Sequence, residues 1–238
     1  TRQQASIGWP LCSRCAVGYS IHSMPARTLR FYFDYISPYA YLAWHRLQTF
    51  APEHDLTIEL RPTVFAGLLN EHGHKGPAEI EPKRLYMFRD CTRLASAMGV
   101  PFEPPASHPF NPLPSLRATL LDMEETTRHT LVSRLYAATW AQSRDVASPE
   151  VVAEVCAEVG LTDVVRRIQE PAVKQKLREV GEEAIARGVF GVPTFVIDDE
   201  LFFGNDSFPH IARYSAGNDP FNPDDAARWE AVRPSARR

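Results

Sequence analysis

Three short segments, far apart in the chain, carry residue types that can bind and activate a thiol. Ser37 precedes Pro38 at the point where an alternating, aromatic-rich run gives way to helical spacing. The N-terminus of such a helix has unpaired backbone N–H groups and a positive partial charge, which stabilise an anion such as a thiolate. The serine hydroxyl can donate one more hydrogen bond to that anion. A serine in this place also serves as a plain helix N-cap, and both interpretations stay open at this point.

The second segment carries backbone groups suited to a peptide ligand. Pro193 leads directly into the apolar run at 194–197. Because proline cannot donate to a sheet, this placement favours the start of a strand. If the Val192–Pro193 bond is cis, the N–H and C=O of Val192 are free to pair with an extended peptide. The alternative is a trans proline that only begins the strand.

The third segment, Phe203-Gly204-Asn205-Asp206, stands where the last predicted helix begins. Helix N-terminal amides hold a carboxylate, and Asp206 can pair with an ammonium group. The segment therefore suits the head group of an amino acid. In the alternative interpretation, Asn205 or Asp206 is a plain helix cap.

Hydrophobic periodicity predicts the elements that position these segments. An aromatic strand, a helix that begins after Ser37 and a second strand have the crossover length of a parallel pair. A buried strand after Pro193, a tight turn at Asp198-Asp199 and an antiparallel partner follow late in the chain. The middle third has helical patterns only. Strands are expected at 28–34, 56–62, 194–197 and 200–203, and helices at 39–50, at 82–99, in three or four pieces over 115–188, and from 205 or 206 to 215.

The order of these elements predicts an α/β framework that carries an inserted helical block. If the framework is a thioredoxin-like fold, the first helix N-terminus and the proline-led strand lie side by side. A short tripeptide with a thiol, glutathione, would then span all three segments. Within the helix at 82–99, the spacing places Leu85, Phe88, Leu94 and Met98 on the inward face.

Composition excludes several classes of partner. The 238 residues carry a net charge of −3, so no basic excess indicates nucleic acid or an anionic membrane surface. No window approaches the roughly 18 apolar residues of a membrane span. The Cys12-x-x-Cys15 pair invites a redox or zinc interpretation, but only His22 lies nearby as a further ligand, and no metal site is predicted. Cys91 and Cys156 fall on amphipathic patterns and are expected to be packed thiols, which fits a reducing cytoplasm.

The three segments also resemble a known family. Phe31–Ala43, Gly188–Phe195 and Phe202–Asp206 are similar, in order and spacing, to the 2-hydroxychromene-2-carboxylate isomerase family. That family is grouped with kappa-class glutathione transferases and, more distantly, with DsbA-type thiol oxidoreductases. The resemblance covers about residues 28–216. It includes the stretches Gly76–Ile80, Lys83–Asp90 and His108–Leu113.

The resemblance implies a thioredoxin-like fold with an inserted all-helical domain, and glutathione as the cofactor. The glutathione sulfur is expected beside Ser37, with its cysteinyl backbone paired to Val192 ahead of a cis Pro193. The γ-glutamyl end is expected against Phe203, Gly204, Asn205 and Asp206. The implied limits are a weakly ordered extension at 1–27, a thioredoxin-like domain at 28–75 and 180–216, the helical domain at 76–179 and a tail at 217–238. A homodimer is also implied.

One segment departs from the family pattern. In the characterised isomerases, a lysine and an asparagine after the second strand help to hold the acidic substrate. Here Leu69 stands near the lysine's place and residues 77–79 near the asparagine's place. Lys75 or His74 is a candidate replacement. This departure fits a relative with a different aromatic or electrophilic substrate.

The implied reaction is isomerisation of a small unsaturated oxo-acid like 2-hydroxychromene-2-carboxylate. The thiolate of glutathione adds to an electrophilic carbon, the former double bond rotates, and elimination of the thiolate gives the isomer. Ser37 lowers the thiol pKa and is not itself the nucleophile. No histidine base is evident beside Ser37, because His45 lies two turns along the helix. Tyr39 and Tyr86 are expected to contact the substrate.

Three alternatives share the fold. A kappa-type transferase, which leaves glutathione attached to its product, would use the same residues. A thioredoxin-like binding module would use them without catalysis. A disulfide oxidoreductase needs C-x-x-C at residues 37–40, where the chain has Ser-Pro-Tyr-Ala, so this alternative is close to excluded unless Cys12 and Cys15 fold back over the site.

Overall fold

A four-stranded mixed sheet forms the centre of the protein, of which the computed structural model describes residues 27–221 and 223–233. The strands are β1 (Arg27–Phe33), β2 (Leu56–Pro62), β3 (Thr194–Ile197) and β4 (Glu200–Phe203). They lie in the order β2-β1-β3-β4, with β1 and β2 parallel and the other two pairs antiparallel. The four predicted strands are confirmed, each to within one residue.

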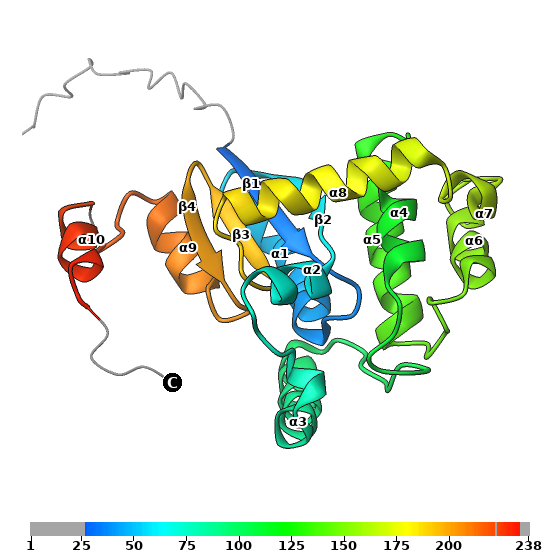
Figure 1. The fold of residues 1–238 in the computed structure, drawn as a ribbon, viewed down its shortest axis with the longest axis horizontal. Coiled ribbons are helices and arrows are strands. Elements are labelled where there is room, and N and C mark those ends of the chain that lie inside the picture. Colours follow the sequence, from blue (N-terminus) through cyan, green and yellow to red (C-terminus); the bar gives the residue numbers. More distant parts are fainter. Residues whose placement is uncertain (1–26, 222, 234–238) are drawn as a thin grey trace, which may run out of the picture.

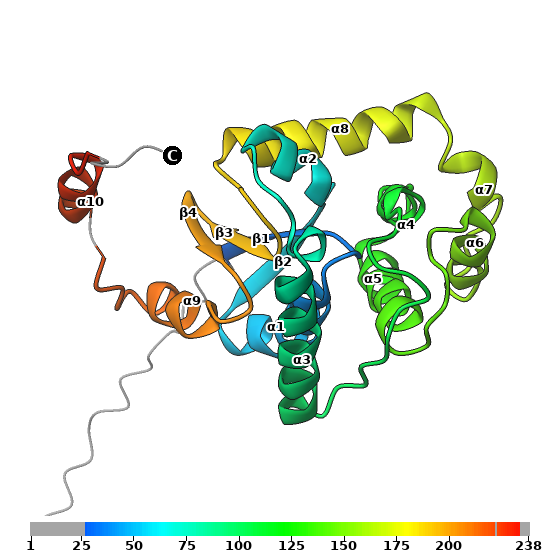
Figure 2. The same ribbon diagram turned by 60° about the horizontal axis from the view of Figure 1, so that its bottom comes forward.

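Helices cover both faces of the sheet, because successive side chains of a strand point to opposite faces. These helices are α1 (Pro38–Glu53), α2 (Phe65–Glu71), α8 (Pro171–Ala186) and α9 (Phe208–Ser215). Phe31 and Phe33 of β1 belong to the larger core with α1 and α9, whereas Tyr32 belongs to a smaller core with α2 and α8. Figures 1 and 2 show α8 on one side of the sheet and α1 on the other.

The middle of the chain is helical, as predicted. Its elements are the short 3-10 helix η1 (Pro77–Glu79), α3 (Glu81–Met98), α4 (Leu113–Thr119), α5 (Glu125–Trp140), α6 (Pro149–Ala157) and α7 (Val164–Arg167). Helices α4 to α7 gather beside the sheet, and α8 leads back from them across it (Figure 1). The thioredoxin-like fold with a helical insertion is therefore observed. The limits at 76 and 179 stay predictions, because α8 runs through residue 179 without a break.

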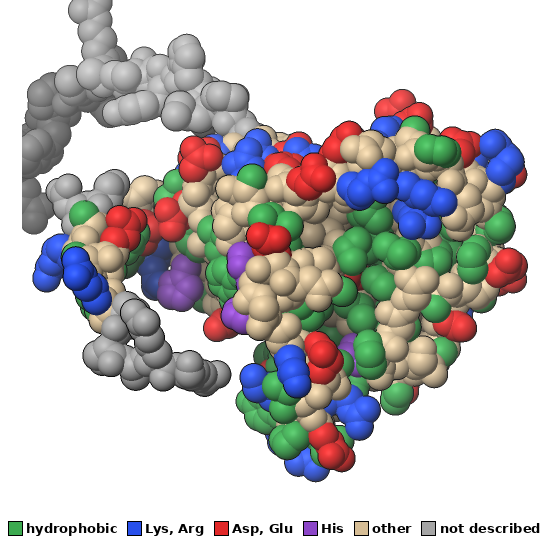
Figure 3. Space-filling view, viewed as in Figure 1, with side chains coloured by type: hydrophobic (Ala, Val, Ile, Leu, Met, Phe, Trp, Pro, Cys, Tyr) green, Lys and Arg blue, Asp and Glu red, His purple; other side chains and the backbone are tan. Residues whose placement is uncertain are grey.

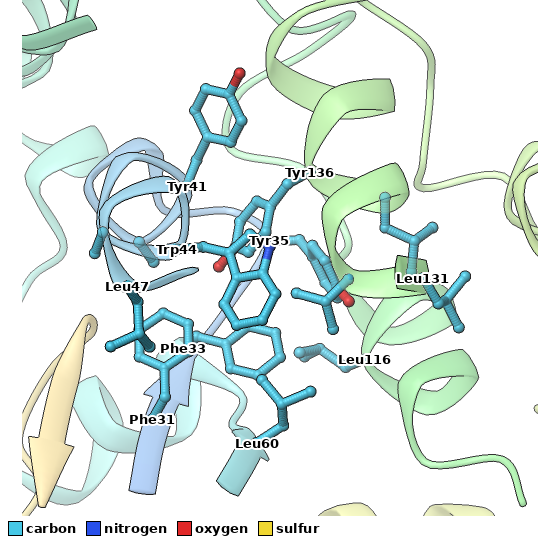
Figure 4. Close-up of a cluster of buried hydrophobic side chains, with 14 of the residues drawn as sticks. Phe31, Phe33, Tyr35, Tyr41, Trp44, Leu47, Leu60, Leu116, Leu131 and Tyr136 are labelled. Carbon is cyan, nitrogen blue, oxygen red and sulfur yellow. The ribbon is translucent and has the colours of Figure 1, made fainter. Parts of the chain in front are cut away.

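Aromatic side chains join the helical block to the sheet. Tyr35, which follows β1, packs against Tyr136 of α5 with ring centroids 4.8 Å apart. Figure 4 shows this pair together with Trp44 between α1 and α5. All three side chains are fully buried. The loop that leads from β1 to Ser37 is thus fixed against the helical block.

Helix α3 presents a different face from the one predicted. Leu85 was expected inward but is 48% exposed, whereas Met87, Cys91 and Ala95 are buried. Those three residues recur every four positions and form one stripe along the helix. Phe88, Leu94 and Met98 pack at the edge of the core. The prediction for Leu85 is wrong because the core covers the stripe through Met87, Cys91 and Ala95, which leaves Leu85 exposed.

The C-terminal region also differs from the prediction. Helix α9 begins at Phe208 with Ser207 at its N-cap, not Asn205 or Asp206. Gly204 has φ +95° and its carbonyl accepts from Ser207 N–H, so a turn occupies the positions expected to be helical. Helix α10 (Pro223–Glu230) lies within the segment expected to be a tail. Apart from residue 27, the expected extension at 1–27 lies outside the described residues.

Candidate functional site

Strand register brings the three predicted segments to one edge of the sheet. Tyr32 near the end of β1 pairs with Thr194 at the start of β3, and Thr194 pairs with Phe203 at the end of β4. At this edge, β1 therefore ends and leads to Ser37, β3 begins directly after Pro193, and β4 ends directly before Gly204. Gly204 N–H donates to the Pro193 carbonyl at 2.9 Å, which joins the second and third segments directly.

Ser37 is the N-cap of α1, as the sequence predicts. Its Oγ accepts from the Ala40 N–H at 3.2 Å, and Pro38 occupies the first turn. The side chain is almost buried, with 8% of the residue exposed. Because Oγ is the acceptor in this bond, the hydroxyl keeps its own proton for a second partner. The cap role and the role of donor to an anion are therefore compatible.

A cavity of about 300 Å³ opens at the N-terminus of α1. Ser37 and Val192 both line it, so the structure brings together two of the predicted segments at one space. The wall is mainly apolar. It comprises Asp34, Ile36, Ser37, Pro38, Tyr39, Val64, Phe65, Ala66, Leu69, Gly76, Pro77, Ala78, Glu79, Met87, His108, Pro109, Phe110, Pro112 and Val192.

The Val192–Pro193 peptide bond is cis. Among the described residues, neither the N–H nor the C=O of Val192 takes part in a backbone–backbone hydrogen bond. Val192 is nevertheless nearly buried. Buried backbone groups are almost always paired, so these two are suited to an extended peptide docked in the cavity. A tripeptide such as glutathione fits this requirement.

The segment from Phe203 to Asp206 lies next to this proline but outside the cavity wall. Side-chain Oδ1 of Asn205 is buried and has no hydrogen-bond partner in the described protein. Gly204 has φ +95°, a backbone conformation that L side chains rarely adopt, so this turn favours glycine. Asp206 is exposed. An unpaired acceptor and an exposed carboxylate are what an ammonium group requires.

The two predicted substrate residues differ in placement. Tyr39 lines the cavity, and its hydroxyl donates to Oδ2 of Asp90 at 2.9 Å. Tyr86 is 61% exposed and does not line the cavity. Both contribute to a shallow neighbouring hollow together with Pro77 and Lys83. The structure therefore brings Tyr39, but not Tyr86, to the space beside Ser37.

The candidate replacements for a substrate-binding cation do not reach the cavity. Leu69 and residues 77–79 line it as the alignment suggests, whereas His74 and Lys75 are exposed and do not. Within the described ranges, no Lys or Arg side chain belongs to the wall. A separate hollow between α2, α4 and α8 is edged by Arg117, Lys174 and Arg178. Figure 3 shows such basic side chains beside hydrophobic ones on this face.

Asp34 is a buried carboxyl in the cavity wall to which the sequence analysis assigned no role. It follows β1 directly and is fully buried. Oδ2 accepts from Phe65 N–H at 2.9 Å and Oδ1 from Ile36 N–H at 3.2 Å. Burial raises the pKa of Asp34 to about 7, although the backbone N–H groups of Phe65, Ile36 and Tyr35 oppose this rise. Asp34 therefore ties the Ser37 loop to the start of α2.

The raised pKa of Asp34 predicts a pH-dependent stability. The folded protein binds this proton more tightly than the unfolded chain, whose aspartate pKa is near 3.8. The stabilisation is complete below about pH 4 and is lost as the pH rises through about 7. We compare the free energy of unfolding of the native protein with that of Asp34→Asn. The advantage of the native protein over the variant should fall by a few kcal/mol as the pH rises from 4 to 8. Urea unfolding at several pH values measures this difference, and a constant difference would refute the assignment.

His108 is the second residue of the wall that the sequence analysis missed. Its Nε2 lies 3.0 Å from the Ile36 carbonyl oxygen, next to Ser37 in the chain. A histidine of the helical block therefore lies near the Ser37 loop, although its contact is with the Ile36 carbonyl and not with the Ser37 hydroxyl. His45 instead packs edge-on against Tyr41. The only signal in the sequence is that His108 begins a stretch, His108–Leu113, that belongs to the resemblance.

The remaining cysteine and metal expectations concern groups outside this site. Burial raises the pKa of both Cys91 and Cys156 to about 12, and both thiols are free, as expected for packed cysteines. Cys12 and Cys15 lie outside the described residues. Within the described ranges no cluster of metal-ligating side chains is found, and no helix is long and apolar enough to cross a membrane.

Comparison with known proteins agrees with this fold. Residues 28–215 match the DSBA-like thioredoxin domain family. The chain is 30% identical over 192 residues to a 2-hydroxychromene-2-carboxylate isomerase of Sphingobium xenophagum, covering 79% of this chain and 97% of that protein. It is 26% identical over 202 residues to glutathione S-transferase kappa 1 of Homo sapiens, covering 78% and 89%. A solved structure of 2-hydroxychromene-2-carboxylate isomerase superposes with a TM-score of 0.73 at 25% identity, covering 86% of this chain and 98% of that chain.

Proposed function

We propose that this chain is an enzyme that works through bound glutathione. The chain belongs to the DSBA-like thioredoxin domain family, and within that family it groups with the 2-hydroxychromene-2-carboxylate isomerases and the kappa-class glutathione transferases. One observation carries the proposal. Ser37, at the N-terminus of α1, and Val192, whose backbone groups have no backbone partner among the described residues, line the same cavity. The first can hold a thiolate and the second a peptide backbone.

Each part of the site has a role in holding glutathione. Val192 pairs with the cysteinyl backbone, because its N–H and C=O have no backbone partner in the part of the chain that the structure describes. Asp206 and the buried Oδ1 of Asn205 receive the γ-glutamyl ammonium group. The Ser37 hydroxyl donates to the sulfur, and the partial positive charge of the α1 N-terminus favours its ionised form. These residues bind and orient; none of them is the nucleophile.

Bound glutathione supplies a thiolate that adds to an electrophilic carbon of the substrate. Reversal of that addition, after rotation about the former double bond, gives an isomer; retention of the new bond gives a conjugate. The protein's part is the same in both cases. Ser37 holds the sulfur anion, while apolar side chains such as Val64, Met87 and Phe110 exclude water from the space where the substrate must lie.

The absence of a positively charged side chain in the described cavity wall favours an uncharged substrate. Among the residues that the structure describes, the ionisable side chains of this wall are those of Asp34, Tyr39, Glu79 and His108, and none of these carries a positive charge when His108 is neutral. A carboxylate placed there would lose its hydration without gaining a cation. We therefore propose a neutral, apolar electrophile, in contrast to the acidic substrate that the resemblance implies.

Replacement of Asp206 tests where glutathione binds. We expect Asp206→Asn to weaken glutathione binding about tenfold, because it removes a charge-assisted contact to the ammonium group. Asp199→Asn is the matched control, since Asp199 is fully exposed at the turn between β3 and β4. Titration calorimetry on the full chain measures both affinities. Equal affinities for the two variants would place the γ-glutamyl end elsewhere, and no binding of the native protein at millimolar glutathione would favour a binding module for another ligand.

Product analysis separates isomerisation from conjugation. Mass spectrometry after exhaustive turnover of an unsaturated ketone shows either free glutathione with an isomer of the substrate or a stable adduct. The isomerase proposal predicts that glutathione is recovered unchanged. A stable conjugate would instead support a kappa-type transferase.

We also propose that the protein works in a reducing cytoplasm, where reduced glutathione is available and buried free thiols persist. We further propose that it forms a homodimer, which analytical ultracentrifugation tests.

A further inference from the structure

Three consecutive backbone carbonyls lead to Ser37, and each accepts a hydrogen bond from a side chain of the helical block. Tyr136 Oη donates to the Asp34 carbonyl at 3.4 Å, and Trp140 Nε1 donates to the Tyr35 carbonyl at 2.9 Å. His108 Nε2 contacts the Ile36 carbonyl oxygen at 3.0 Å. The donors lie 72 to 105 positions from their acceptors in sequence. The helical block therefore holds the whole loop that precedes the N-cap of α1.

The third of these bonds fixes the peptide group that carries Ser37. A peptide unit is planar, so the Ile36 carbonyl and the Ser37 N–H move together. His108 holds the oxygen at one end of this plane, and the Ser37 N–H donates to the Asp34 carbonyl at 3.1 Å at the other. With both ends held, the backbone from which the Ser37 side chain leaves is fixed, and the Ala40 N–H contacts Oγ itself.

The chemistry of His108 makes it the donor. A carbonyl oxygen can only accept, so Nε2 must carry the proton. Burial lowers the pKa of His108 and Arg84 of α3 acts in the same direction, whereas the hydrogen bond to the Ile36 carbonyl raises it; the net lowering favours the neutral ring. Nδ1 is then the unprotonated nitrogen; it is buried and has no partner among the described residues. Edge contacts with the rings of Phe88 and Phe110 hold the imidazole in place.

His108 differs from the two α5 donors in its position. Tyr136 and Trp140 are fully buried in the aromatic core, whereas His108 also lines the cavity. We propose that His108 is a positioning residue for catalysis: by holding the Ile36 carbonyl it sets the Ser37 hydroxyl at the distance from the glutathione sulfur that stabilises the thiolate. This inference rests on the proposed role of Ser37. The same imidazole forms part of the wall that the substrate contacts.

A pair of variants isolates the hydrogen bond from the volume of the ring. His108→Gln retains an N–H donor on a side chain of similar reach, whereas His108→Leu fills space without a donor. We expect His108→Leu to lower kcat by about 3- to 10-fold, the loss of one neutral hydrogen bond, with the KM for glutathione changed less than kcat. The thiol pKa of bound glutathione should rise in His108→Leu and return toward the native value in His108→Gln. Equal losses in the two variants would overturn the proposal.

A double-variant cycle separates failure of this inference from failure of the proposed function. In a Ser37→Ala background, His108→Leu should have no further effect on the thiol pKa, because the hydroxyl that it positions is gone. If Ser37→Ala alone leaves the thiol pKa unchanged, the proposed role of Ser37 fails. If Ser37→Ala raises it but His108→Leu acts equally in both backgrounds, only the positioning role fails.

A measurement on the native protein keeps the inference testable if a variant does not fold. Long-range proton–nitrogen NMR spectra report which ring nitrogen of a histidine carries the proton. The inference requires the neutral Nε2–H form of His108 at neutral pH, with and without glutathione. A neutral Nδ1–H form would overturn it, because that form cannot donate to the Ile36 carbonyl.

Discussion

Replacing Ser37 with alanine is expected to lower kcat/KM by about 10- to 100-fold and to raise the thiol pKa of bound glutathione by about 1 to 2 pH units. A hydrogen bond to a charged group contributes about 1.5–3 kcal/mol, and each 1.4 kcal/mol is a factor of ten. The α1 N-terminus stays in place in the variant, so part of the thiolate stabilisation should remain. Steady-state kinetics and the ultraviolet absorbance of the thiolate measure the two effects.

The chain contains a matched control for the loss of a helix cap. Ser148 precedes Pro149 at the start of α6, and its Oγ accepts from the Val151 N–H at 3.4 Å. Ser148→Ala therefore removes the same kind of Ser-Pro cap away from the cavity. Each variant should cost about 1 kcal/mol of stability, but only Ser37→Ala should affect activity. If the two variants lose activity equally, Ser37 is no more than a cap.

Placing a cation in the cavity is expected to change which substrates the enzyme accepts. Leu69 on α2 lines the cavity, and its Cδ1 lies close to Gly76 on the same wall. At an effective dielectric constant of about 20, a lysine about 5 Å from a carboxylate contributes about 3 kcal/mol. The carboxyls of Asp34 and Glu79 compete for that lysine. We therefore expect Leu69→Lys to raise kcat/KM for an acidic substrate, relative to its methyl ester, by about 10- to 100-fold.

The ester and its free acid form a matched pair, because they differ chiefly in charge at one position. The native protein should prefer the ester of an unsaturated oxo-acid to the acid itself. Leu69→Gln, which is polar but uncharged, controls for the change in shape and should keep this preference. A native protein that already favours the acid would contradict the uncharged substrate, and would show that a carboxylate is held by groups other than those in the described wall.

The sheet and the site segments were predictable because local patterns specify them. Alternating aromatic residues in β1 and the apolar run after Pro193 place the strands, and a Ser-Pro pair places the start of α1. The cis bond before Pro193 was expected and is observed. The convergence of Ser37 and Val192 at one cavity then follows from the strand order, since both flank neighbouring strands at the same edge.

What the sequence could not supply depends on contacts between distant segments. Asp34 has a role because α2 places the Phe65 N–H against it, and α2 is too short to give a clear periodic signal. His108 reaches the Ser37 loop across 72 positions of chain. No pattern in the segment between α3 and α4, which contains His108, indicates that contact. The outward placement of Leu85 likewise depends on which face of α3 the core covers.

The central claim is that the protein holds the glutathione sulfur as a thiolate at Ser37. Titration of the thiolate absorbance of glutathione bound to the native protein, against pH, tests it most directly. We predict a thiol pKa at least about 1 unit below the value near 8.5 of an ordinary cysteine thiol, so that a substantial fraction of the bound sulfur is thiolate near neutral pH. A pKa equal to that of free glutathione would contradict the account, because neither the Ser37 hydroxyl nor the α1 N-terminus would then act on the sulfur.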